Sequence, residues 1–208
     1  AMAQNEALYY DGLPLQYTKG DLERFKDRTN PNYHPNVNWY EEGTRNFSEN
    51  NQFNVMMRGG GKRVRYMALL DYKNKFGLLN EDYTHYSDRY NSQIRTYELG
   101  LRMNLDVDIT SSTQMKFGLY GIIGEDKRPN TDINTIFQNF YKVPAAAFPV
   151  KTLNNNWGSN TLFKMNPIAA IADVGYVQEN RRMLETDMRI TQDFSMFLKG
   201  LSAEVAVA

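Results

Sequence analysis

Residues Tyr97–Asp108 read Y-E-L-G-L-R-M-N-L-D-V-D and alternate strictly between two kinds of side chain. The apolar parity comprises Tyr97, Leu99, Leu101, Met103, Leu105 and Val107, and the polar parity comprises Glu98, Gly100, Arg102, Asn104, Asp106 and Asp108. Because successive side chains of a β-strand point to opposite faces, this stretch predicts a strand with one apolar face. A helix would scatter the apolar residues around its axis. The stretch is also long enough to cross a bilayer, which takes roughly 9–11 tilted residues.

The composition of the 208 residues narrows the class of protein. No run approaches the ~20 apolar residues of a membrane-spanning helix, which excludes a helical membrane protein. A β-barrel is not excluded, because its strands spend every second residue on a polar lumen. The 14 tyrosines and 11 phenylalanines suit the aromatic girdles of such a barrel. The net charge of zero gives no sign of a nucleic-acid partner.

Residues with catalytic or ligand chemistry are few. Cysteine is absent, which excludes disulfides, a thiol nucleophile and thiolate metal ligands. His34 and His85 both fall in expected loops, and Glu41-Glu42 and Glu81-Asp82 are more typical of solvated loop acids than of a carboxylate dyad. No hydrolase, zinc-protease or phosphate-loop motif occurs. We therefore predict no enzyme activity, no catalytic residue, no cofactor and no metal site.

Alternation like that of Tyr97–Asp108 recurs along the chain. It predicts strands at 51–58, 63–72, 90–108, 113–123, 182–191 and 201–207. Gly59-Gly60-Gly61-Lys62 is expected to be a hairpin turn whose glycines take positive φ, rather than a phosphate cradle. Short turns there and at 109–112 and 192–199 alternate with long links at 73–89 and 124–180. Outer-membrane barrels show this asymmetry, whereas soluble sandwiches usually have short turns at both ends.

The segments outside the strands predict helices and loops. Helices are expected at 1–11 and at 19–28, the second with a Thr18/Asp21 capping box, and another at 132–141; 30–40 is expected to be an ordered loop. Tyr33, Trp39, Tyr40, Phe140, Tyr141 and Trp157 are loop aromatics that either stack on sugar rings or pack the loops. No signal peptide is recognisable, so an exported form would have lost its N-terminus.

These elements predict an all-β fold of antiparallel up-and-down strands. Residues 1–48 would form an extracellular loop and helical segment, and 49–208 a partial transmembrane β-barrel of about six strands with long, partly helical loops. If the apolar face of Tyr97–Asp108 contacts lipid, the pairing register of this strand must be the one that keeps its charges off that face. A shift of one residue would place Arg102 in hydrocarbon, at a cost of roughly 2–4 kcal/mol. A soluble antiparallel β-sheet that binds a ligand through the 124–180 loop remains the alternative.

Several segments also carry a family resemblance. Y-T-K-G-D-L-E-R-F-K-D (17–27), N-P-N-Y-H-P-N-V-N-W-Y-E-E (30–42), the hairpin of 51–72, F-G-L-L-N (76–80), 90–106, N-P-I-A-A-I-A-D-V-G-Y (166–176) and T-Q-D-F-S-M-F-L-K-G-L-S (191–202) together resemble SusC/RagA-type TonB-dependent outer-membrane transporters. The resemblance covers essentially the whole chain and corresponds to the early β-barrel region that follows the plug.

The resemblance implies a function, a location and partners. Such transporters import oligosaccharides or peptides across the bacterial outer membrane through a 22-stranded barrel, energised by TonB through an N-terminal part that this chain lacks, and usually capped by a SusD-like surface lipoprotein. About six strands cannot close such a pore, so the chain would be a fragment of one. Substrate contacts in the family lie in variable loops, so no substrate-binding residue is assigned.

Overall fold

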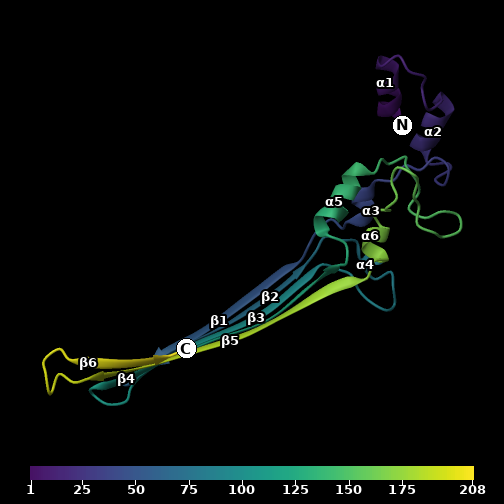
Figure 1. Ribbon diagram of the computed structural model, residues 1–208. Coiled ribbons are helices and arrows are strands. Elements are labelled where there is room, and N and C mark those ends of the chain that lie inside the picture. Colours follow the sequence, from purple (N-terminus) through teal and green to yellow (C-terminus); the bar gives the residue numbers. More distant parts are fainter. The chain divides into compact units, whose positions relative to one another are not determined.

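The computed structural model describes residues 1–208, which fold as two compact units (Figure 1). The first unit comprises 1–47, 78–94 and 128–177, and the second comprises 48–77, 95–127 and 178–208. The first unit therefore combines the N-terminal residues with most of the two long connections between strands. The second unit is built from the strands themselves.

The strands form one antiparallel sheet in which neighbours in sequence are neighbours in space (Figure 1). In order they are β1 (Asn50–Gly60), β2 (Val64–Phe76), β3 (Arg95–Asp108), β4 (Thr113–Pro129), β5 (Tyr176–Asp193) and β6 (Ser202–Val207). This order confirms the predicted fold class of antiparallel up-and-down strands. Strands β1 and β6 lie at the two edges of the sheet.

Several strands extend farther toward the long connections than alternation predicts. Strand β2 continues past Tyr72, where Lys75 pairs with Thr96 and Phe76 with Arg95. Strand β4 likewise runs on to Pro129, and the loop expected at 124–180 spans 130–175. Strand β3 in contrast begins at Arg95, not near residue 90. Backbone hydrogen bonds define these ends, and they are formed regardless of which side chains the residues carry.

The first turn differs from the prediction. Gly59 and Gly60 belong to β1 and pair with Tyr66 and Arg65, so the connection is residues 61–63. Gly60 has a positive φ of 159°, as expected for a glycine of this turn, whereas Gly61 does not. Gly60 also lets the two strands approach closely at the turn, because a Cβ on this residue would lie 2.4 Å from the carbonyl oxygen of Val64.

The helices all lie in the first unit. The predictions of α1 (Met2–Tyr10), α2 (Lys19–Asp27) and α5 (Ile133–Lys142) are confirmed, and the Thr18/Asp21 capping box is present. Three short helices were not predicted: α3 (Trp39–Gly43), α4 (Glu81–Thr84) and α6 (Ala169–Ala172). Thus the loop expected at 30–40 ends in a helical turn, which the Asn38 side chain caps. None of the helices has the length and apolarity that crossing a membrane would require.

The first unit has an ordinary buried core. Its members are Trp39, Leu79, Ile136, Phe140, Val143, Phe148, Ile168, Ala170 and Ile171. These residues come from all three sequence segments of the unit, and helices α3 and α5 lie close together (Figure 1). The long connections are therefore folded structure, held by apolar burial between segments that are far apart in sequence.

Candidate functional site

The register of the sheet places most of the apolar residues of its strands on one face. Leu70 lies opposite both Val55 and Leu101, and directly opposed residues share a face. In β5, Leu184 lies 3.6 Å from where a Cβ of Gly121 would be, which sets the facing of that strand. The face includes Phe53, Val55, Met57, Tyr66, Ala68, Leu70, Tyr72, Leu99, Leu101, Met103, Leu105, Phe117, Leu119, Ile123, Leu184, Met188, Ile190, Val205 and Val207.

This apolar face has no second layer packed over it. Phe53 is 64% exposed, Leu184 71% and Val205 67%, and even Leu101, in a central strand, is 37% exposed. The only buried hydrophobic residue of the sheet, Ile122, lies on the opposite face, because it pairs with Gly100. The sheet thus presents a broad apolar surface rather than half of a closed core.

Aromatic side chains border the aliphatic part of this face. Near the long connections the ring centroids of Phe53 and Tyr72 lie 6.1 Å apart, and those of Tyr72 and Tyr97 lie 5.7 Å apart. Toward the short turns, Tyr66 and Phe117 both lie opposite Leu105. Between these rows the residues are aliphatic, methionine, glycine and threonine except for Arg182, which lies beside Leu99 and Ile123 near the Phe53–Tyr72 row. Apart from this arginine, the layout resembles an apolar band between two aromatic girdles.

The height of the band fits a bilayer. The apolar side chains of β3 continue past the Tyr66–Phe117 row to Val107, and the strand from Tyr97 to Val107 extends about 33 Å at roughly 3.3 Å per residue. At the tilt typical of barrel strands this projects to about 25 Å, the usual height of the lipid-facing band. Charged residues lie at the end of this face toward the long connections: Arg182 is beside Leu99 and Ile123, and Glu125 lies opposite Tyr97. The guanidinium of Arg95 lies 5.0 Å from the centroid of Phe76.

The opposite face carries the charges, many of them in ion pairs. Glu98 of β3 accepts from Lys73 of β2 at 3.1 Å and, across β4, from Arg181 of β5 at 3.4 Å. Arg65 lies 3.2 Å from Asp108 nearer the short turns. These pairs are partly exposed, which suits a wet surface and adds little to stability.

His34 lies in a small structural cluster at the start of α2. Its Nε2 is 3.1 Å from the Asp21 carboxylate, and its ring contacts Phe25 edge-on. Hydrogen bonds from the Thr18 hydroxyl and backbone, followed by the bond from His34, lower the pKa of Asp21 to about 2. The cluster therefore holds the beginning of a helix.

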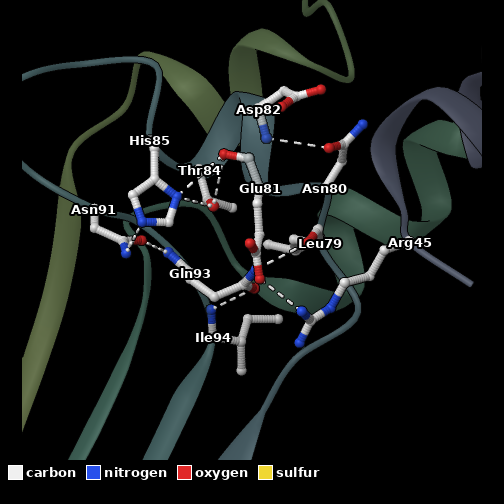
Figure 2. Close-up of polar contacts among 10 residues, drawn as sticks. All are labelled: Arg45, Leu79, Asn80, Glu81, Asp82, Thr84, His85, Asn91, Gln93 and Ile94. Carbon is white, nitrogen blue, oxygen red and sulfur yellow. Dashed lines mark hydrogen bonds and ion pairs between the residues drawn. The ribbon is translucent and has the colours of Figure 1, made fainter. Parts of the chain in front are cut away.

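His85 belongs to a polar network in the connection between β2 and β3 (Figure 2). Its Nδ1 lies 3.1 Å from the Glu81 carbonyl oxygen, and its Nε2 lies 2.6 Å from the Asn91 amide nitrogen. Asn91 in turn accepts from the backbone N–H of Gln93, whose buried side chain donates to the Leu79 carbonyl at 2.9 Å. The network thus fixes the path of this connection.

The two acidic pairs do not form carboxylate dyads. Glu81 accepts from Arg45 at 2.6 Å, while the Asp82 carboxylate points away from it (Figure 2). Glu42 accepts a hydrogen bond from the Tyr83 hydroxyl, and burial, with this bond, raises the pKa of Tyr83 well above its ordinary value. No group of three or more histidine, aspartate and glutamate side chains is placed to hold a metal ion.

The structure separates the loop aromatics into two groups. Trp39 and Phe140 pack in the core, whereas Tyr33 and Tyr141 are 72% and 74% exposed. Tyr40 lies between these extremes. Trp157 lines a cavity and contacts Tyr86, a residue that the sequence did not single out. Only a contact between the two long connections brings these rings together, so no local pattern could have revealed the pair.

No family model matches the sequence, and no curated protein matches it. The fold and the site define the class as an open antiparallel sheet with one uncovered apolar face and one charged face, accompanied by a helical unit. The function is therefore inferred from this geometry.

Proposed function

We propose that the chain is part of the wall of a bacterial outer-membrane transport barrel of the SusC/RagA type. The apolar face of the sheet contacts lipid and the charged face lines the lumen. The observation that supports this best is the uncovered apolar face, which is continuous across all six strands. In the same proposal the whole transporter imports oligosaccharides or peptides, acts with a SusD-like lipoprotein and is energised by TonB.

An uncovered face of this size is costly in water. Burying one large aliphatic side chain is worth about 1.5–3 kcal/mol, and soluble monomers rarely expose apolar patches above a few hundred Å². A soluble sheet buries such a face under a second layer. Against lipid tails the same face carries no such cost, which favours the membrane over water as its surroundings.

The connections support the same proposal. Residues 61–63, 109–112 and 194–201 form short turns at one end of the sheet, and 77–94 and 130–175 form long connections at the other. Short turns on the periplasmic side and long loops outside are the pattern of outer-membrane barrels. The long connections here are folded around the Trp39 core, as a loop region that recognises a ligand requires.

A soluble ligand-binding sheet is the second candidate. The buried core of the first unit favours it, because that part is organised like any water-soluble domain. On this alternative both faces of the sheet would meet water or a protein partner. The two candidates therefore differ in what contacts Leu101 and Met103.

Single cysteines distinguish the candidates, because these 208 residues contain none. Leu101→Cys and Met103→Cys place a thiol on the apolar face, and Arg102→Cys and Asn104→Cys are matched controls one residue away. In the complete protein in isolated membranes, a membrane-impermeant maleimide should label positions 102 and 104 but not 101 and 103. Detergent-denatured samples should label at all positions. Equal labelling of the four in membranes would refute the proposal.

A further inference from the structure

A cavity of about 480 Å³ lies beside α6 in the first unit. Its lining includes Trp157, Ser159, Lys164, Met165, Asn166 and Asp173. The volume falls within the range of small-molecule sites, which combine an apolar wall with a few polar groups. Here the wall is an indole, and a hydroxyl, an ammonium and a carboxylate lie around it.

The indole is held in place by one residue of the lining and by two residues outside the cavity. Its Nε1–H donates to the Asp173 carboxylate at 3.2 Å, which ties the wall to an acidic group of the lining. The Lys151 ammonium lies 3.3 Å from the ring centroid and also donates to the Tyr86 hydroxyl at 3.0 Å. Because Lys151 and Tyr86 do not line the cavity, they support the ring without filling the site.

The backbone beneath the cavity is also fixed. Asn166 is 3% exposed and donates to the carbonyl oxygens of Val150 and Gly158 at 3.1 and 3.0 Å. A Cβ on Gly158 would lie 2.0 Å from the Pro149 carbonyl oxygen, so only glycine fits there. The site is therefore built before any ligand arrives, which lowers the entropy cost of binding.

We propose that this cavity binds a neutral saccharide ring. The C–H faces of a sugar ring pack on an indole, while its hydroxyl groups both donate and accept. Asp173 uses one oxygen for the indole and offers the other to sugar hydroxyls, and Ser159 and Lys164 supply further polar contacts. The opposite charges of Lys164 and Asp173 favour a ligand without net charge. Built on the proposed transport function, this inference selects saccharides over peptides as the substrate class.

Tryptophan fluorescence can test the site directly, because the chain has only two tryptophans and Trp39 is buried in the core. The signal of Trp157 is obtained by subtracting the spectrum of the Trp157→Phe variant. The purified complete protein is titrated with maltose, cellobiose and lactose, and with trialanine as the peptide probe. At least one disaccharide should change the Trp157 emission, with a Kd around the millimolar range.

Two variants place the binding in the cavity. Asp173→Ala should weaken disaccharide binding about tenfold or more, equivalent to roughly 1.4 kcal/mol. Tyr141→Ala, which removes an exposed aromatic ring outside the cavity, should bind as the wild type does. Unchanged circular dichroism spectra will show that both variants are folded.

Three results would overturn the inference: no disaccharide alters Trp157 emission, trialanine does so in place of the disaccharides, or Asp173→Ala binds with unchanged affinity. None of these results bears on the cysteine labelling at 101–104, which reports on the sheet alone. Failure of the saccharide site and failure of the membrane proposal are therefore distinguishable.

Discussion

The two units use similar apolar residues in opposite ways. In the first unit Ile136 and Ile168 are completely buried, whereas in the second Leu101 and Leu184 remain 37% and 71% exposed. The first unit hides its apolar side chains among themselves, and the sheet displays them in one plane. Within one chain, the first unit thus covers its apolar side chains and the sheet leaves them uncovered.

The largest expected effect is a loss of stability when a buried side chain of the first unit is truncated, compared with no such loss when an exposed side chain of the sheet is truncated. Ile136→Ala should lower the free energy of unfolding of the first unit by about 2–5 kcal/mol, because it leaves a cavity in a closed core. Both tryptophans lie in that unit, so denaturant titration followed by tryptophan fluorescence reports on it alone. Leu101→Ala should leave this transition unchanged. An equal loss in both variants would show that the units do not differ as described.

The next effect tests the two faces of one strand. Leu101→Arg should disfavour the membrane-inserted state by about 2–4 kcal/mol, because it places a charge on the face that we propose contacts lipid. Asn104→Arg, on the charged face, is the control and should cost little. The measurement is the fraction of the complete protein that resists urea extraction from membranes. Similar losses in both variants would contradict the assignment of the faces.

A smaller expected effect is a local loss of stability in α2 that leaves the stability of the core of the first unit unchanged. Thr18→Ala removes the hydroxyl that accepts from the Asp21 N–H, and loss of such a cap costs about 1 kcal/mol. Amide hydrogen exchange should become faster in 19–27. The tryptophan transition of the core should stay where it is. A large shift of that transition would instead show that α2 and the core unfold as one.

Acid should act on the same helix. The pKa of Asp21 is lowered to about 2 in the folded chain, below its unfolded value near 3.9. A depressed pKa contributes stability that is complete above the unfolded value and is lost as the pH falls toward 2. Protection of 19–27 should therefore decline between about pH 4 and pH 2, and in Thr18→Ala the Asp21 pKa, followed by NMR, should rise. An unshifted pKa in that variant would contradict the assigned cause.

The difference between the units also explains what the sequence could predict. Strand alternation is local, so Tyr97–Asp108 and its neighbours revealed both the strands and their two faces. The capping box at Thr18 and the amphipathic pattern that places Ile136 and Phe140 together are equally local. Strand ends such as Lys75–Phe76 were missed, because pairing there depends on the partner strand.

The first unit was largely hidden from sequence reasoning. Helices α3 and α4 are too short to show a helical period, and only their asparagine caps mark them. The core joins Trp39, Leu79 and Ile168, whose neighbours in sequence have no common pattern. The cavity beside Trp157 depends in the same way on contacts between distant segments. The sequence therefore predicted the elements in which apolar and polar residues alternate periodically, but it did not predict how segments distant in sequence pack together.

The open edges of the sheet set a rule for any strand that joins it. Strands β1 and β6 each present one row of backbone groups without a partner strand, and such rows are templates for pairing. A newcomer beside β6 must place apolar residues opposite Val205 and Val207 and a polar one opposite Glu204. A strand shifted by one residue in register would place its apolar side chains on the charged face of the sheet. The edges of the sheet therefore select for strands whose apolar and polar residues alternate in the same register as those of β6.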